Sequence, residues 1–185
     1  IAEICEHVGA DVTEVEHALR TDPRIGNKAY IRPGNAFSGG TLGRDITYLN
    51  HIANQKDLKT PVLAGVIASN NNRRSWLFRR CMKILGRSAK TSTVAILGLA
   101  YKPETNSIRR SISIELIREL IEQVAHVRAF DPKVKSLPQG LSDVTLVTAM
   151  EDVLDGAHVL IIATDWSEFL NLTPQLLIKR MAKPV

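Results

Sequence analysis

Basic side chains gather in the loop that follows a short β-rich run. The run 93–97 ends at Gly98, and the loop carries Lys102, Thr105 and Arg109 before a helical pattern begins. Because the first backbone N–H groups of a helix are unpaired, this place favours an anion. The residue types indicate a nucleotide phosphate, although a solvated basic loop has the same composition. The turn holds one glycine and no GxGxxG pattern, so dinucleotide binding in the usual mode is not expected here.

A second candidate anion site is the stretch 21–40, which has neither helical nor strand periodicity. So long a segment without periodicity is usually functional or disordered. It combines basic side chains with glycines: Arg24, Lys28, Arg32, Gly26, Gly34, Gly39 and Gly40. The apolar side chains of Ile25, Tyr30, Ile31 and Phe37 favour a packed loop, whose backbone would close around an anion.

Helical patterns flank this stretch on both sides. The first ends at Gly9, and the pattern Asp11-Val12-Thr13-Glu14 resembles a capping box that begins a second, short helix. After the stretch, a helix is expected from Leu42 to about Gln55.

The segment 60–86 predicts one long helix of about 40 Å. Thr60 fits the N-cap, Pro61 the first helical position, and Gly86 the end. Two apolar runs at helical spacing are separated by the polar stretch 69–74. Either the helix is exposed at mid-length, or it is a spine whose two apolar ends are buried in different cores.

Beyond Gly86, short apolar runs alternate with helical segments. The runs lie at 93–97, 127–130, 144–147 and 158–163, which predicts an α/β, Rossmann-like parallel sheet with right-handed crossovers. Ligands of such sheets bind at the carboxyl ends of the strands. Asp131 ends the second run and could bind a ribose hydroxyl or cap the loop before Pro132. The expected divisions are 1–59, part of a helical domain, 60–86, the connecting helix, and 87–185, a truncated Rossmann-like domain.

Composition leaves several classes of partner open. Apolar residues make up 44% of the chain, and the net charge of +5 favours anionic partners. With 5% aromatic residues and no known module, nucleic acid is the weakest of the candidates. No run approaches the roughly 20 apolar residues of a membrane span, and no signal peptide is visible. Both ends fall inside expected elements, so a fragment is expected. Cys5 and Cys81 occupy apolar helical stripes and are interpreted as small core residues.

The order of several motifs resembles the UDP-glucose/GDP-mannose dehydrogenase family over its central and C-terminal domains. The matching stretches are GADVTEVEHAL, DPRIG, GGTLGRD, SNNNRR, VAILGLAYKPETNSIRRS, VRAFDP and ATDWSEF. In that family an N-terminal domain holds NAD, the central long helix forms a homodimer, and the C-terminal domain binds the nucleotide sugar. Two hydride transfers convert a primary alcohol of the UDP- or GDP-linked sugar into a carboxylate. The resemblance implies a cytoplasmic, NAD-dependent oxidoreductase of polysaccharide biosynthesis.

The resemblance also assigns roles to single residues. Asp45 matches the catalytic aspartate, and Lys102 matches a lysine that contacts the nucleotide sugar. Arg109 matches an arginine near the cofactor, and Arg24 one that reaches the sugar nucleotide across the dimer interface. Three further residues fall in the family's substrate loop: Gly34, Phe37 and Gly39.

This chain departs from the family pattern at the nucleophile. Thr41 occupies the position of the catalytic cysteine, and Ser107 stands where an aspartate is expected. A threonine hydroxyl is far less ionised than a thiol and needs an adjacent base. The first interpretation is therefore a fragment of a nucleotide-sugar 6-dehydrogenase. The alternative is a nucleotide-sugar-binding homologue that stops at the aldehyde or has lost oxidation.

Overall fold

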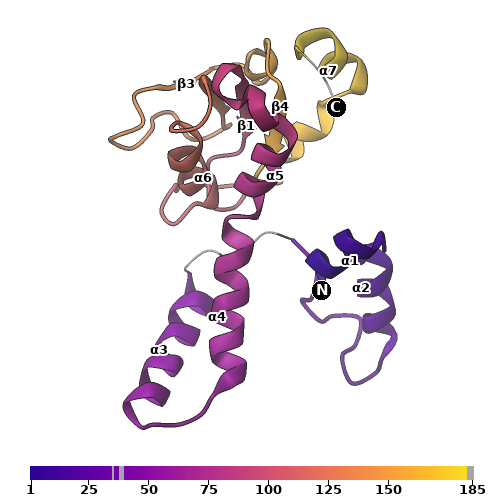
Figure 1. The fold of residues 1–185 in the computed structure, drawn as a ribbon. Helices are drawn as coiled ribbons and strands as arrows, with labels where there is room; N and C mark the ends of the chain where they lie inside the picture. The colour runs from indigo at the N-terminus through magenta and orange to yellow at the C-terminus, as the bar shows by residue number, and fades with distance from the viewer. Residues whose placement is uncertain (35, 38–39, 183–185) are drawn as a thin grey trace. The chain divides into compact units, whose positions relative to one another are not determined.

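The computed structural model describes residues 1–34, 36–37 and 40–182. The chain divides into two compact units, Ile1–Ala36 and Phe37–Val185, and each is described by itself. The ribbon in Figure 1 follows the chain from indigo at the N-terminus to yellow at the C-terminus.

The first unit contains two short helices, α1 (Ala2–Val8) and α2 (Val12–Thr21). Gly9 closes α1 in the left-handed conformation with φ 71°, and Cys5 is the buried residue of that helix. Asp11 begins α2 and accepts the backbone N–H of Thr13 at 2.8 Å, which confirms the predicted cap. The hydroxyl and amide of Thr13 lower the pKa of the Asp11 carboxyl.

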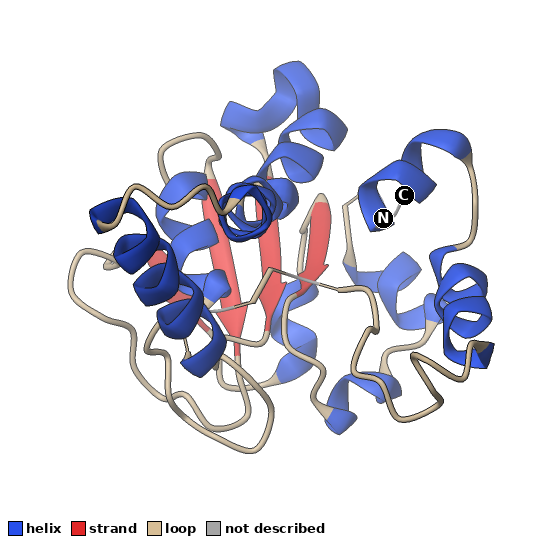
Figure 2. Ribbon diagram, turned by 90° about the horizontal axis from the view of Figure 1, so that it is seen from below, coloured by secondary structure: helices blue, strands red, loops and turns tan. Residues whose placement is uncertain are grey.

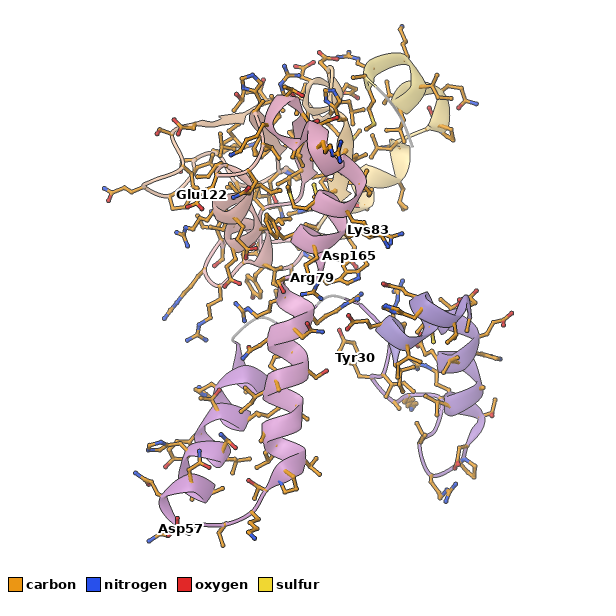
Figure 3. The ribbon with its side chains drawn as sticks, viewed as in Figure 1. Tyr30, Asp57, Arg79, Lys83, Glu122 and Asp165 are labelled. Atoms are coloured by element: carbon orange, nitrogen blue, oxygen red, sulfur yellow. The ribbon has the colours of Figure 1, made fainter. Side chains whose placement is uncertain are left out.

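The loop after α2 is not packed in the way its apolar residues led us to expect. Tyr30 is fully exposed, and Ile25 and Ile31 are 41% and 38% exposed. Figure 3 labels Tyr30 on this loop. With so little apolar burial, the loop is shaped mainly by hydrogen bonds, among them those of Gly26 N–H and Ile25 N–H to the carbonyl of Asp22.

The second unit opens with an antiparallel pair of helices, α3 (Thr41–Gln55) and α4 (Pro61–Arg74). Figure 1 shows α3 running alongside α4. Thr60 is the N-cap of α4 and Pro61 its first helical residue, as predicted, although the Thr60 side chain makes no capping hydrogen bond.

The predicted long helix is nearly continuous but is interrupted once. After α4, a turn at Ser75 leads into α5 (Trp76–Leu85) and the 3₁₀ helix η1 (Gly86–Thr91). The Ser75 hydroxyl donates to the carbonyl of Asn72 at 3.2 Å, and such bonding back to the preceding turn competes with the helical ladder. Gly86 ends α5 with φ 52°, as predicted.

The four predicted strands form one parallel sheet in the order β3-β2-β1-β4. They are β1 (Thr93–Leu97), β2 (His126–Phe130), β3 (Val144–Leu146) and β4 (Val159–Ile162). Both pairings of β1 are parallel, with Ile96 opposite Ala129 on β2 and opposite Ile161 on β4. The predicted α/β fold class is confirmed.

Helices cover both faces of this sheet, as Figure 2 shows. The helices of this unit that follow β1 are α6 (Ile112–Leu120), η2 (Met150–Leu154), η3 (Ser167–Asn171) and α7 (Pro174–Arg180). The segment at 150–154 is a 3₁₀ helix, and α7 begins after its N-cap Thr173, whose side chain accepts the Leu176 N–H.

The core lies in the sheet and in the helices packed on it. All of β1 is buried, and α6 contributes Ile114, Ile117 and Leu120. Cys81 and Leu85 of α5 join this core, whereas Val62 and Val66 of α4 are 77% and 36% exposed. Thus only the second apolar run of the predicted long helix is buried in the sheet domain. Among the described residues, no helix is long and apolar enough to cross a membrane.

Candidate functional site

A buried carboxylate organises the carboxyl edge of the sheet. Asp131 follows β2, is 2% exposed, and accepts five hydrogen bonds. Its Oδ2 receives the backbone N–H groups of Leu99 at 2.7 Å and Ala100 at 3.0 Å. Its Oδ1 receives the N–H groups of Lys133 at 2.9 Å and Val134 at 3.0 Å. Of the two roles open to Asp131, the structure supports the capping one, because the carboxylate is already saturated with protein donors.

The fifth donor to Asp131 comes from the loop after β4. The indole Nε1 of Trp166 donates to Oδ2 at 3.3 Å, and Trp166 is 2% exposed. The Thr164 hydroxyl donates to the carbonyl of Ala100 at 2.8 Å. The segments that follow β1, β2 and β4 are thereby joined by hydrogen bonds, one between two side chains and the others between a side chain and the backbone.

Gly98 lies where no other residue would fit. Its φ is +92°, and a Cβ placed there would lie 2.5 Å from Thr164 Cβ and 2.7 Å from Thr164 N. This crowding, together with the use of the Leu99 and Ala100 amides by Asp131, leaves no glycine cradle for a pyrophosphate at the turn after β1. A nicotinamide dinucleotide therefore does not fit this turn as its principal site, in agreement with the missing GxGxxG pattern.

The loop after β1 presents Lys102 and Arg109 to solvent. Both side chains are exposed, and the Lys102 ammonium lies 5.6 Å from the centre of the Tyr101 ring. The loop is closed on itself by a bond from Tyr101 N–H to the carbonyl of Ser107 at 3.1 Å. Thr105, predicted beside these residues, accepts the Ser107 N–H at 3.2 Å and so shapes the loop.

A salt bridge fixes the tip of the same loop to the loop that follows β2. Lys133 Nζ lies 2.5 Å from Glu104 Oε2, and the same ammonium lies 5.5 Å from the centre of the Trp166 ring. Glu104 and Arg110 adopt left-handed backbone conformations with φ of 61° and 59°.

Thr41 and Asp45 lie one turn apart at the start of α3. Thr41 is the first helical residue, and both side chains are exposed. At 3.6 residues per turn they share one face of the helix. Arg44 donates from Nε to Asp45 Oδ1 at 3.0 Å, so the predicted catalytic carboxylate carries a basic partner. Nothing in the sequence pattern assigned a role to Arg44.

The opposite face of α3 packs towards α4 around a small hollow. This hollow has a volume of about 100 Å³, and Gly43, Ile46 and Thr47 line it from α3. Ile67 and Asn70 line it from α4. Because it lies on the side of α3 away from Thr41 and Asp45, it is not the place where those two side chains act.

Phe37 is held by α4. Its N–H donates to Asn70 Oδ1 at 2.9 Å, and its carbonyl accepts from Asn70 Nδ2 at 3.2 Å. The predicted substrate-loop residue Gly39 lies outside the described residues. Gly34 is exposed and belongs to the first unit.

Arg24 also belongs to the first unit. Its guanidinium contacts Asp22, with 2.6 Å between Arg24 Nη2 and Asp22 Oδ2. These hydrogen bonds lower the pKa of the Asp22 carboxyl. The role of Arg24 across a dimer interface stays a prediction.

Basic residues of α4 and α5 make several contacts inside the protein. Arg74 forms an ion pair with Glu115 of α6, and the Arg73 guanidinium stacks on the Trp76 ring at 4.0 Å. Arg79 donates to the carbonyl of Asn72 at 3.0 Å. Figure 3 labels Arg79 and Lys83, which follow one another by one turn along α5. In the described part of the chain, no group of three metal-ligating side chains comes together.

Two family models match the chain. The model described as the UDP-glucose/GDP-mannose dehydrogenase family, central domain, matches residues 1–72. The model described as the same family's UDP binding domain matches residues 95–185.

Similar proteins of known sequence and structure are found as well. A UDP-glucose 6-dehydrogenase of Rickettsia bellii is 31% identical over 100% of this chain and 43% of its own length. That of Rattus norvegicus is 35% identical over 100% of this chain and 40% of its own length. The structure of a UDP-glucose dehydrogenase from Pyrobaculum islandicum matches with a TM-score of 0.82 and 28% identity, covering 90% of this chain and 39% of that one. The chain thus spans about two fifths of the length of these relatives.

Proposed function

The chain belongs to the UDP-glucose/GDP-mannose dehydrogenase family, and we propose that it is the central and nucleotide-sugar-binding part of an NAD-dependent nucleotide-sugar 6-dehydrogenase. The proposed reaction oxidises a primary alcohol of a UDP- or GDP-linked sugar. A cytoplasmic location and a role in polysaccharide biosynthesis are part of this proposal and rest on the family resemblance. The division of the chain into residues 1–59, 60–86 and 87–185 is also part of this proposal.

The observation that carries the proposal is the exposed basic loop at the carboxyl edge of the sheet. It lies inside the segment that matches the UDP binding domain. A backbone bond between Tyr101 and Ser107 closes the loop, and the Lys133–Glu104 salt bridge holds its tip. We assign the contact with the nucleotide sugar to Lys102. The substrate loop would contribute Gly34, Phe37 and Gly39, and a second subunit would contribute Arg24.

The oxidation itself is proposed at the exposed face of α3. Asp45, which is paired with Arg44, would hold or move the proton of the alcohol that is oxidised. Oxidation of the alcohol to the aldehyde needs such a base but no covalent nucleophile. Oxidation of the aldehyde to the carboxylate uses a thiol in the family pattern, and Thr41 stands in that place. Because Thr41 is there, we expect the second oxidation to be slow at best. A homologue that stops completely at the aldehyde, or has lost oxidation, is the competing candidate, and the same Thr41 position favours it.

The hydride acceptor is not held by the turn after β1. Because that turn is closed by Thr164 and Asp131, Arg109 would add one contact to a cofactor that another domain binds. We therefore expect residues 1–185 alone to bind NAD at best weakly. Micromolar affinity for NAD in calorimetry on these residues would contradict this.

A homodimer through α4 and its neighbour α3 completes the proposal. Large apolar side chains are exposed along this pair, including Leu42, Tyr48, Leu49, Leu58 and Val62. Such a surface is typical of an interface. Light scattering at high protein concentration should give the mass of a dimer, and Val62→Glu should lower it. A strictly monomeric mass with the helices intact would contradict the dimer.

The experiment that tests the proposed function is a screen of substrates. UDP- and GDP-linked sugars are added to the full-length protein with NAD, and NADH formation and product mass are followed together. We expect oxidation of at least one of these sugars. If every sugar binds and none is oxidised, the binding homologue is the correct interpretation.

A further inference from the structure

Asn70 and Arg74 lie four residues apart on α4 and therefore on the same face of that helix. Each contacts a segment far away in the sequence. Asn70 contacts Phe37, and Arg74 contacts Glu115. The polar stretch 69–74, which separates two apolar runs and has no part in the proposed reaction, is thus a point of contact between three segments.

The Asn70 side chain bonds to both backbone polar groups of one residue, Phe37. Its Oδ1 accepts the Phe37 N–H at 2.9 Å, and its Nδ2 donates to the Phe37 carbonyl at 3.2 Å. This paired geometry imitates the pairing of two strands, so it fixes the direction of the backbone as well as its position. Phe37 lies four residues before Thr41, in the loop to which the proposed function assigns sugar binding.

The Arg74 guanidinium donates hydrogen bonds from two of its nitrogens to the carboxylate of Glu115. Arg74 Nε donates to Glu115 Oε2 at 3.0 Å, and Nη2 donates to Oε1. Both side chains are partly shielded, at 28% and 37% exposed. Glu115 lies in the first turn of α6, directly after the loop that carries Lys102 and Arg109. A bidentate pair of this kind restricts orientation more than a single contact does.

The turn at Ser75 explains why such a brace is useful. It interrupts the helix between α4 and α5, and helices bend at interruptions of this kind. The Arg74–Glu115 pair spans this interruption. It ties the last turn of α4 directly to α6.

We propose that Asn70 and Arg74 are positioning residues that hold the substrate loop at Phe37 in register with the basic loop at Lys102. The inference rests on the proposed function for the identity of the two loops. Neither side chain needs to touch the substrate. The side chain of Asn70 is bonded to Phe37, and the guanidinium of Arg74 is bonded to Glu115. Loss of either contact lets the two loops move independently.

The first test reads the loop itself and does not depend on enzymatic activity. Hydrogen exchange of the Phe37 amide is measured by mass spectrometry in the full-length protein, in Asn70→Ala and in Asn71→Ala. Asn71 is the matched control, because it is an exposed asparagine at the next position of the same helix. We expect exchange about ten-fold faster in Asn70→Ala and unchanged in Asn71→Ala. Asn70→Asp, which keeps the acceptor and loses the donor, should fall between them. Equal exchange in wild type and Asn70→Ala overturns the proposal.

The second test measures coupling between the two contacts. Calorimetry with UDP-glucose compares Asn70→Ala, Glu115→Gln and the double variant, with Glu119→Gln as control, one turn further along α6 and exposed. Each single variant should weaken binding several-fold, and the double variant should add little, because one lost contact already frees the loops. Additive losses, or losses equal to those of Glu119→Gln, contradict the proposal. If the wild type binds no nucleotide sugar, the proposed function fails while the exchange experiment still decides the positioning role.

Discussion

The indole Nε1 of Trp166 donates to the Oδ2 atom of Asp131 at 3.3 Å, and the two side chains are equally buried at 2% exposure. One comes from the loop after β4 and the other from the end of β2. Since the same oxygen accepts the Leu99 and Ala100 amides after β1, a single carboxylate sets the relative positions of three loops. The basic loop with Lys102 starts from this cluster.

Asp131→Asn should destabilise the protein. An amide offers one acceptor oxygen where the carboxylate offers two, so at least two of the five donors would face an N–H group. We expect a loss of at least about 2 kcal/mol in the free energy of unfolding. Urea titration measures it, with Asp143→Asn as the control. Asp143 is exposed, and its change should stay within about 0.5 kcal/mol. A loss no larger than that of Asp143→Asn would show that the cluster is not needed for stability.

Comparing the unfolding free energies of Gly98→Ala and Gly140→Ala distinguishes the cost of backbone strain from the cost of steric crowding. Both glycines have positive φ, +92° and +83°, but only at Gly98 would an added Cβ meet heavy atoms within 4 Å. Gly140→Ala should cost about 1–2 kcal/mol from the left-handed backbone alone. Gly98→Ala should cost about 1–3 kcal/mol more, because Thr164 must move. Equal losses in thermal or urea unfolding would mean that the contact with Thr164 relaxes freely.

Lys102→Ala should weaken binding of UDP-glucose to the full-length protein. Losing a charge-assisted hydrogen bond costs about 1.5–3 kcal/mol, which is roughly ten-fold or more in affinity. Calorimetry measures the dissociation constant, and Lys179→Ala, an exposed lysine of α7, is the control for net charge. Unchanged affinity in Lys102→Ala would remove this lysine from the site.

The Cys81 thiol makes stability depend on pH in the alkaline range. Burial raises the pKa of the Cys81 thiol from 9.0 to about 11. The folded state therefore holds the proton more tightly than the unfolded state, so this contribution is complete below about pH 9 and is lost as pH rises through about 11. The difference in unfolding free energy between wild type and Cys81→Ala should shrink above about pH 9. A difference that stays constant as the pH approaches about 11 would contradict the raised pKa.

Much of the fold follows from local sequence signals. The β-rich run of β1 and the glycines at 9 and 86 predict element types and ends, because these signals act within a few residues. The interruption at Ser75 was missed, since a single serine inside a helical pattern gives no strong signal. The loop at Tyr30 was expected to pack, because composition cannot tell whether a partner surface is present.

The candidate site was predictable in type but not in its connections. Lys102 and Arg109 were predicted as site residues because a basic loop at a strand end has a clear chemical meaning, and the structure places both in an exposed loop there. Their contacts with a ligand stay a prediction. The roles of Asp131 and Asn70 depend on partners more than thirty residues away, at Leu99 and Phe37, which no local pattern reveals. The motifs FDP and SNNNRR were visible as parts of the family resemblance, but their hydrogen bonds come from the structure alone.

The most direct test of the account is the product stoichiometry of the full-length protein beside that of Thr41→Cys. With a nucleotide sugar and NAD, the unmodified protein should release about one NADH per sugar quickly, and the aldehyde should accumulate or react slowly. Thr41→Cys should speed carboxylate formation, because a thiol is partly ionised at neutral pH and intrinsically nucleophilic, whereas Thr41→Ser should not. Mass spectrometry of the sugar, read beside the NADH yield, distinguishes these outcomes. Rapid release of two NADH per sugar by the unmodified protein would contradict the account, because Thr41 or a water that it positions would then complete the oxidation.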